Sequence, residues 1–201
     1  MARTKAKDHN EKRDHILKTA AQVFATEGLA RASMSQVAKA CGISKANIYH
    51  YYDSKDDLLF DILDSYLKSL RDQIVAVPVN ADDPVEELKS MLGTILIAYQ
   101  GMDAEHKIQT EGISLLPEDQ QIILKGHQRE MVQRLNRILL SVEPEILEKD
   151  RGMLHATTMS VFGMINWYYM WNKTADKEAR LKYANLVAKL TVNGVRGLDD
   201  M

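Results

Sequence analysis

Cysteine, proline and aromatic residues are scarce in this 201-residue chain, which has one cysteine, four prolines and 6% aromatic residues. Since a disulfide needs two cysteines, the chain cannot contain an internal disulfide framework. No apolar run approaches the roughly eighteen residues that a membrane-spanning helix requires. Residues 1–12 are charged and lack the apolar centre of a secretory signal. We therefore expect a cytoplasmic protein that does not enter a membrane, large enough for one domain plus a small one.

The patterns of common catalytic and metal sites are also absent. The six histidines show neither HxxxH nor HExxH spacing. There is no glycine-rich phosphate-binding loop and no GxSxG motif around a nucleophilic serine. His106 and Glu111 are close enough in sequence to form a polar pair, although two ordinary polar residues explain this spacing more simply. The sequence predicts a protein that is not an enzyme and carries no metal or other resident cofactor.

Charge is distributed unevenly along the chain. The net charge is −2, which by itself disfavours a nucleic-acid-binding protein. Residues 1–52, however, contain nine Lys/Arg and four Asp/Glu, a net charge of +5, so the remainder carries −7. A basic end on an acidic body favours local docking to phosphates. A solvated basic tail produces the same asymmetry, so the charge alone does not decide.

Apolar residues recur at helical spacing along most of the chain, with no strand-like alternation and no internal repeat. We expect residues 1–10 to be disordered, either as a solvated tail or as a basic arm that contacts phosphates or a minor groove. Two prolines within residues 77–84 mark the clearest break. The predicted helices cover residues 11–27, 33–41, 45–52, 55–72, 85–99, 117–142, 147–172 and 176–197, with a less periodic segment at 103–116.

Residues 33–58 carry the most specific signal, two short helices joined by a tight turn and followed by a third helix start. Ser33 and Gln36 form a capping box, in which each side chain satisfies a backbone N–H at the start of a helix. Gly42 stands at the turn, where only glycine adopts a positive φ without steric cost. Ser44 is placed to cap the second helix. Such abrupt boundaries are typical of a helix-turn-helix, whose second helix protrudes to enter a DNA major groove.

The second short helix, residues 45–52, has the composition of a DNA-reading helix. Ile48 and Tyr52 lie four residues apart and can anchor it inward. Its other side chains are polar or amphipathic: Lys45, Asn47, Tyr49 and His50. The alternative is an aromatic cluster that caps a small core. Cys41 lies on the apolar face of the first short helix, so we interpret it as a small core residue and not as a nucleophile.

Three sequence elements follow one another in the order and spacing of a known DNA-binding domain. They are Ile16-Leu17-x-x-Ala20-x-x-Val23-Phe24-x-x-x-Gly28, Val37-Ala38-x-x-Cys41-Gly42-Ile43-Ser44 and Ile48-Tyr49-His50-Tyr51-Tyr52-x-Ser54-Lys55-x-x-Leu58. They resemble the TetR family of one-component transcriptional regulators over about the first quarter of the chain, with Tyr52 where the family more often has Phe. The resemblance implies an all-α fold of about nine helices. Residues 1–54 would form an N-terminal arm and a three-helix helix-turn-helix DNA-binding domain, and residues 55–201 a larger ligand-binding and dimerisation domain.

The same resemblance implies the DNA contacts. The predicted DNA-binding residues are Ser33, Ser35, Ser44, Lys45, Ala46, Asn47, Tyr49, His50 and Lys55. Tyr49 and His50 match positions that contact phosphates or bases, and Asn47 can pair bidentately with an adenine edge. Lys55 matches a phosphate contact, and Ser33 lies at a helix start, where backbone N–H groups attract phosphate. We expect Lys55→Ala to weaken binding to all DNA equally and Asn47→Ala to relax the preference at one operator position.

The segment MSVFGMINWYYMW at residues 159–171 holds both tryptophans and is apolar nearly all round, so it must be covered on more than one side. A central core helix explains part of this pattern, while methionine and aromatic side chains also suit a pocket for bulky apolar ligands. In the resembled family the last two long helices of each subunit form a four-helix dimer interface. This implies a homodimer through residues 150–172 and 177–197, which also places two reading helices on a two-fold related operator.

The sequence Asn166-Trp167-Tyr168-x-Met170-Trp171-Asn172, followed by a last helix that contains Tyr183, resembles a TetR subgroup that senses acyl-CoA thioesters. These relatives typically repress genes for fatty-acid, steroid or aromatic-acid degradation. The predicted ligand-binding residues are Met91, Ile95, Tyr99, Arg129, Met131, Trp167 and Met170. The cations for the CoA phosphates would be Lys125, Arg129, Arg134 and Arg137, which a solvated helix face explains equally well.

The sequence thus predicts a one-component regulator, a repressor that a bulky apolar inducer such as an acyl-CoA releases from a palindromic double-stranded DNA operator. The alternative is a helical ligand-binding or partner-binding module whose helix-turn-helix is vestigial and does not bind DNA. The identity of the inducer, the operator sequence and the choice between repression and activation are not determined by the sequence.

Overall fold

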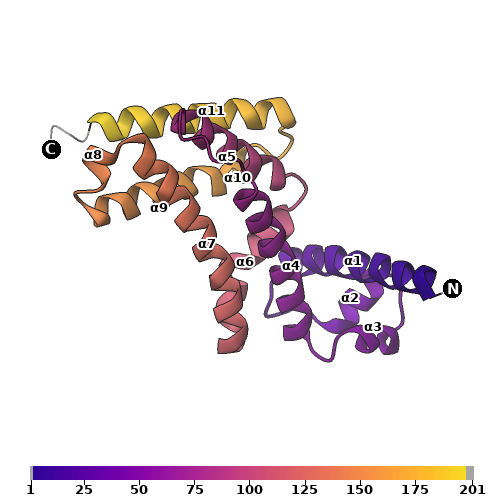
Figure 1. Cartoon of the computed structure of the whole chain (residues 1–201). Coiled ribbons are helices and arrows are strands. Elements are labelled where there is room, and N and C mark those ends of the chain that lie inside the picture. Colours follow the sequence, from indigo (N-terminus) through magenta and orange to yellow (C-terminus); the bar gives the residue numbers. More distant parts are fainter. Residues whose placement is uncertain (1, 198–201) are drawn as a thin grey trace. The chain divides into compact units, whose positions relative to one another are not determined.

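The computed structural model describes residues 2–197, with side chains from residue 9 onward. It contains α1 (Ala2–Glu27), α2 (Met34–Ala40), α3 (Lys45–Tyr51), α4 (Lys55–Val75), α5 (Pro84–Ala98), α6 (Asp103–Leu115), α7 (Glu118–Val142), α8 (Pro144–Leu147), α9 (Arg151–Asn166), α10 (Tyr168–Trp171) and α11 (Lys177–Arg196). Every regular element in this range is a helix (Figure 1), which confirms the all-α fold class. Two of the eleven helices, α8 and α10, are single four-residue turns. No helix in this range is both long and apolar enough to cross a membrane.

The chain forms two compact units. Within the described range, unit 1 comprises residues 2–68 and 101–125, and unit 2 comprises residues 69–100 and 126–197. Both α4 and α7 therefore contribute residues to each unit. By compactness, α6 and most of α4 belong to the same unit as the first three helices. The boundary expected at residues 54/55 separates DNA binding from ligand binding and dimerisation, and it stays a prediction.

Helix α1 provides one wall of the unit 1 core. Ile16, Ala20 and Phe24 are almost completely buried along one face, as their spacing predicts. The helix begins at Ala2, so the expected disorder of residues 1–10 is wrong for residues 2–10, whose backbone is helical; Met1 lies outside the described residues. Residues 2–10 contain no Gly or Pro, and a helix already anchored by its buried stripe extends at little cost through Ala, Lys and Arg.

Helix α6 packs closely against α1 and α4 within unit 1. A Cβ atom on Gly112 would lie 3.3 Å from side-chain carbons of both Leu29 and Leu63, so the absent side chain allows this close approach. The Lys107 ammonium donates a 2.6 Å hydrogen bond to the carbonyl oxygen of Ala25, in the last turn of α1. These contacts tie α6 to the helices that carry the helix-turn-helix.

The core of unit 2 forms where α5 packs on α11. Leu88, Leu92, Ile95 and Val187 are fully buried there. Helix α5 begins as the sequence predicts, because the Asp83 carboxylate accepts a hydrogen bond from a first-turn N–H and Pro84 follows at the first helical position.

Two expectations about the later helices are wrong. The helix predicted over residues 147–172 is instead α9, which begins at Arg151, and the separate turn α10, while Leu147 ends the turn α8. The Tyr183 hydroxyl donates a 3.1 Å hydrogen bond to the carbonyl of Met164 in the last turn of α9, which gives one carbonyl group at this helix end a partner. The helical spacing of apolar residues over 117–142 also predicts that Ile123 faces inward, whereas its side chain is 47% exposed on α7.

Candidate nucleic-acid interface

Side-chain caps fix the boundaries of α2 and α3. The Ser33 N–H donates to Oε1 of Gln36 at 2.9 Å and Ser33 Oγ accepts from the Gln36 N–H at 3.3 Å, which is the predicted capping box. Gly42 adopts φ +68° in the turn. Ser44 Oγ then accepts from the Asn47 N–H at 3.1 Å and caps α3. Local sequence signals therefore position α3 as a separate, protruding helix.

A buried anchor and a polar network hold α3 against the rest of unit 1. Ile48 is completely buried. The Tyr52 hydroxyl, one residue beyond α3, donates a 2.6 Å hydrogen bond to Oδ2 of Asp61 on α4, and Nε of Arg13 on α1 donates to the same oxygen at 3.0 Å. Burial, reinforced by the Asp61 carboxylate, raises the pKa of Tyr52 well above that of an ordinary tyrosine. Sequence reasoning missed this link, because Asp61 and Arg13 show no local pattern that pairs them.

The opposite face of α3 is exposed. Lys45, Ala46, Tyr49 and His50 are all exposed, as the prediction requires. The Lys45 ammonium lies 6.0 Å from the centre of the Tyr49 ring, so cation and aromatic ring form one continuous surface. The capping residues Ser33 and Ser44 are exposed beside it, together with Ser35. The contacts of all these residues with DNA stay predictions.

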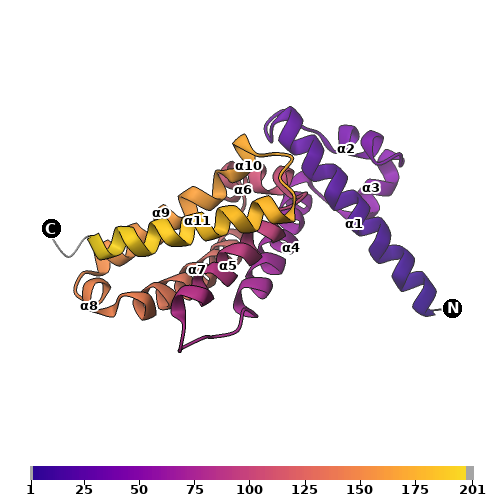
Figure 2. The ribbon, with the colours of Figure 1, turned by 90° about the horizontal axis from the view of Figure 1, so that it is seen from above.

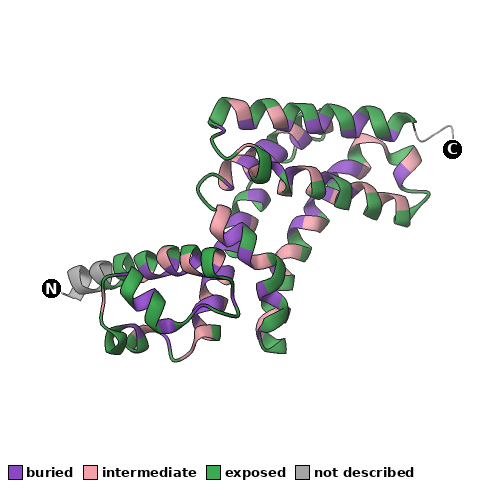
Figure 3. Cartoon of the chain, turned by 180° about the vertical axis from the view of Figure 1, so that it is seen from behind, coloured by how far each residue is buried: buried purple, intermediate pink, exposed green. Residues whose placement is uncertain are grey.

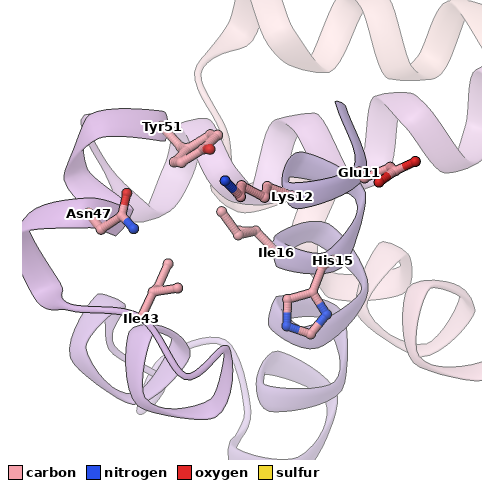
Figure 4. A pocket seen from close by; sticks show the side chains of 7 residues that line it. All are labelled: Glu11, Lys12, His15, Ile16, Ile43, Asn47 and Tyr51. Carbon is pink, nitrogen blue, oxygen red and sulfur yellow. The ribbon is translucent and has the colours of Figure 1, made fainter. Parts of the chain in front are cut away.

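Two residues of the predicted set have a different environment. The Lys55 ammonium donates to the carbonyl oxygens of Leu29 at 2.7 Å and Ala32 at 3.4 Å, so it connects the loop after α1 to the start of α4. The Asn47 side chain is turned toward α1 across a small cavity (Figure 4). Neither side chain is directed like those of Lys45 and Tyr49.

The residues predicted to bind a ligand in the body do not form one enclosed group. Met91, Ile95, Tyr99 and Met131 are buried. Trp167 and Met170 are 63% and 46% exposed, and Arg129 is exposed as well, so these three do not line an internal cavity of a single chain. Trp167 and Met170 follow the end of α9 at Asn166, and the next turn buries Tyr168 and leaves these two side chains at the surface.

Arg134, one of the cations predicted to bind the CoA phosphates, is already part of an ion pair. Arg134 and Glu87 form a buried ion pair with an N–O distance of 2.5 Å. Arg134 also donates to the carbonyl oxygen of Val77 at 3.1 Å, and Glu87 accepts from the Asn80 N–H at 2.7 Å. The pair therefore fastens the linker between α4 and α5, and Arg134 is not positioned for a ligand phosphate.

Helices α9 and α11 run side by side (Figure 2). Residues of both helices line a groove. The groove has a volume of about 680 Å³. Six of its twelve lining residues are small: Gly152, Ala156, Thr157, Ser160, Thr191 and Gly194. Apolar side chains, including those of Met153, Met164 and Leu190, form most of the remainder. Leu186 and Leu190 are 49% and 54% exposed on α11, and exposed positions continue along this helix (Figure 3). Unit 2 thus presents exposed leucine side chains on α11 together with an open groove, and small residues make up half of the groove lining.

The helix-turn-helix also matches known proteins. A family model described as bacterial regulatory proteins, tetR family, matches residues 16–62. The crystal structure of a TetR-family transcriptional regulator from Bordetella parapertussis 12822 is 31% identical to this chain. It covers 89% of this chain and 93% of its own length, with a TM-score of 0.80. The chain belongs to the TetR family.

Other known proteins share the fold or part of the sequence. The structure of AibR in complex with isovaleryl coenzyme A and operator DNA is 22% identical and covers 89% of this chain and 97% of its own length, with a TM-score of 0.72. The transcriptional repressor KstR2 of Rhodococcus jostii (strain RHA1) is 30% identical over 95 residues, which are 47% of this chain and 45% of KstR2. The regulator YerO of Bacillus subtilis (strain 168) is 30% identical, and 39% of its length is matched. The chain thus spans less than half the length of these curated relatives.

Proposed function

We propose that this TetR-family chain is a cytoplasmic, DNA-binding transcriptional repressor that acts as a homodimer and is released from its operator by a bulky apolar ligand. The observation that carries the proposal is the capped helix-turn-helix, which holds α3 by buried Ile48 and leaves Lys45, Tyr49 and His50 exposed on its outer face. A protruding helix with cationic, aromatic and hydrogen-bonding side chains has the chemistry for major-groove and phosphate contacts. A vestigial motif would not need both caps intact.

The surface of α9 and α11 supports the homodimer. A two-fold axis places the same patch on both subunits, so the patch must fit itself. Leu186 and Leu190 of one subunit would fill the small-residue groove of the other, with Ala156 and Ser160 in its lining. We expect Leu190→Glu to give monomers, since it would bury a charge in that groove. Asn185→Glu, about 140° around the same helix, is the matched control and should stay dimeric in size-exclusion chromatography with light scattering.

An acyl-CoA remains the inducer class that we propose. The support is the likeness of the fold to AibR, whose structure contains isovaleryl coenzyme A. In this chain the buried side chains of Met91, Ile95 and Tyr99 would contact the apolar portion of the ligand. Of the cations predicted for the CoA phosphates, Lys125, Arg129 and Arg137 are exposed.

Release from DNA requires that the ligand bind two conformations with different affinity. Helix α4 connects the two parts of the chain, and we expect ligand binding to shift it. Helix α6 offers a second way for ligand binding to affect the DNA-binding helices, because Gly112 and Lys107 tie α6 to α1 within unit 1. A displacement of α6 would then reach the helix-turn-helix through packing.

Two measurements test the proposal. Gel-shift titration uses the DNA upstream of the gene that encodes this chain, and native mass spectrometry measures the binding of long-chain and aromatic acyl-CoAs. We expect a dimer that retards the fragment, binds acyl-CoA stoichiometrically and then releases the DNA. Tyr49→Ala should lose the shifted band while keeping acyl-CoA binding. A band that no acyl-CoA releases would contradict the inducer class, and a wild-type protein that retards no fragment would contradict the DNA-binding function.

A further inference from the structure

A cavity lies between α1 and α3, beside the exposed face of α3 (Figure 4). Its volume is about 270 Å³, and since one water molecule occupies roughly 30 Å³ in the liquid, it is far larger than a packing defect. Seven residues line it: Glu11, Lys12, His15, Ile16, Ile43, Asn47 and Tyr51. All seven belong to unit 1, so the helices that bear the DNA-binding motif form the entire site.

The lining combines an apolar floor with a hydrogen-bonding rim. Ile16 and Ile43 extend into the cavity from opposite sides, and Lys12 and Asn47 face each other above them (Figure 4). The Glu11 carboxylate is turned away from the cavity in the same view. Glu11 is the one acidic residue of the lining, and its other polar residues, Lys12, His15, Asn47 and Tyr51, carry hydrogen-bond donors, in residues 1–52, whose net charge is +5.

The hydrogen-bonding rim of the cavity lies beside the exposed outer face of α3. Asn47 and Tyr51 are four residues apart and share one flank of α3, between buried Ile48 and the exposed outer face. Tyr51 is also held by α1, because its ring stacks on His9 with 5.1 Å between the ring centres. The flank that faces α1 is thus ordered before any partner binds.

We propose that the α1–α3 cavity seats the sugar–phosphate backbone of one DNA strand while α3 lies in the adjacent groove. This inference rests on the proposed DNA-binding function and adds α1 to the interface. The side chains of Ile43 and Tyr51 contact a deoxyribose, and buried Ile16 forms the floor beneath it. Lys12, His15 and Asn47 donate hydrogen bonds to the phosphate, which is where most protein–DNA hydrogen bonds are made.

The inference changes the role of Asn47. A side chain that reads an adenine edge must extend from the outer face of α3, whereas the Asn47 amide is directed toward α1. Asn47 therefore positions the duplex and carries no information about one base pair. This role differs from the sequence-based expectation in a measurable way, because a phosphate contact affects every DNA sequence equally.

The test measures binding of full-length Lys12→Ala, His15→Ala and Asn47→Ala to an operator duplex and to a scrambled duplex over a range of salt concentrations. We expect each variant to lose affinity for both duplexes by the same factor. Lys12→Ala should also reduce the slope of log K against log[salt] by about one, the value for one lost phosphate contact. Asn47→Ala should leave that slope unchanged, because asparagine carries no charge.

A matched variant serves as the control. Lys18→Ala removes an exposed lysine from another face of α1, and it should bind as the wild type does. Thermal unfolding of each variant checks that the fold is intact. Wild-type binding with a Lys12→Ala slope equal to that of Lys18→Ala would overturn the cavity as a backbone seat. An Asn47→Ala variant that loses affinity for the operator duplex but not for the scrambled duplex would also overturn the cavity as a backbone seat. A wild-type protein that binds neither duplex would overturn the proposed function itself.

Discussion

The side chain of Lys55 is bound to the backbone of Leu29, whose carbonyl oxygen accepts a 2.7 Å hydrogen bond from the ammonium. The two residues are 26 positions apart in sequence, and the whole helix-turn-helix lies between them. The Lys55 hydrogen bond therefore connects the two ends of the segment that contains this motif. Its remaining N–H group can still reach a phosphate, but the hydrogen bonds to the chain are present without DNA.

For this reason we expect Lys55→Ala to destabilise the protein by about 1–2 kcal/mol, since it leaves two carbonyl oxygens without a charged donor. Urea unfolding of the full chain measures the change. Lys39→Ala, at an exposed position in the last turn of α2, is the matched control and should change stability by less than about 0.5 kcal/mol. Equal stability of the two variants would show that the Lys55 hydrogen bonds contribute nothing.

The Tyr52 hydroxyl supports α3 through Asp61, and Tyr52→Phe removes this hydrogen bond while keeping the buried ring. We expect a loss of about 1 kcal/mol of stability together with weaker DNA binding, since α3 loses a fixed end. Tyr51→Phe removes the neighbouring hydroxyl from a half-exposed ring and is the control. If both variants unfold at the same urea concentration, Asp61 does not hold α3.

The buried pair of Glu87 and Arg134 is suited to a double-mutant cycle. Either Glu87→Leu or Arg134→Met alone leaves one buried charge without its partner, at an expected cost of about 3–5 kcal/mol. The double variant should cost less than the sum of the two single variants, because it removes both charges. Additive costs, measured by chemical denaturation, would mean that the two charges do not stabilise each other in the folded chain.

Glu105 on α6 predicts a dependence of stability on pH. Burial raises the pKa of this carboxyl group, despite the opposing effect of nearby Lys18. A carboxyl group whose pKa is higher in the folded state favours folding only while it is protonated, so its burial lowers stability as pH rises through the folded-state pKa. Glu105→Gln should therefore melt at a higher temperature than the wild type at pH 7.5, and this advantage should shrink toward pH 4.5.

Glu111→Gln on the same helix is the matched control, since Glu111 is exposed. It should melt with the wild type at both pH values. An advantage of Glu105→Gln that is independent of pH would point to a cause other than the ionisation of this carboxyl group.

Local signals account for what could be predicted from the sequence. The capping box at Ser33, the positive φ of Gly42 and the inward Ile48 involve residues a few positions apart, where short-range rules apply. The fold class followed from periodicity in the same way. The exposed face of α3 was predictable because Ile48 fixes which side is buried.

The remaining features depend on contacts between distant residues. The Tyr52–Asp61–Arg13 network and the carbonyl acceptors of Lys55 join segments that no periodicity relates. The Tyr183 hydroxyl likewise reaches the Met164 carbonyl from the next long helix. Apolar spacing identifies a helix with two apolar faces but does not tell which face is covered in a single chain, so it could not show that Trp167 and Met170 are exposed. The predicted ligand contacts stay predictions.

The single cysteine described at the outset lies inside the helix-turn-helix, where Cys41 is buried at the end of α2. Burial raises the pKa of its thiol, so the folded chain exposes little reactive thiolate. A thiol reagent can modify this chain at one atom only, and only when the α2–α3 turn opens. The rate of alkylation under native conditions thus gives the opening free energy of the DNA-binding motif separately from that of the body. The same rate, measured with and without operator DNA, would report how strongly the bound duplex suppresses that opening.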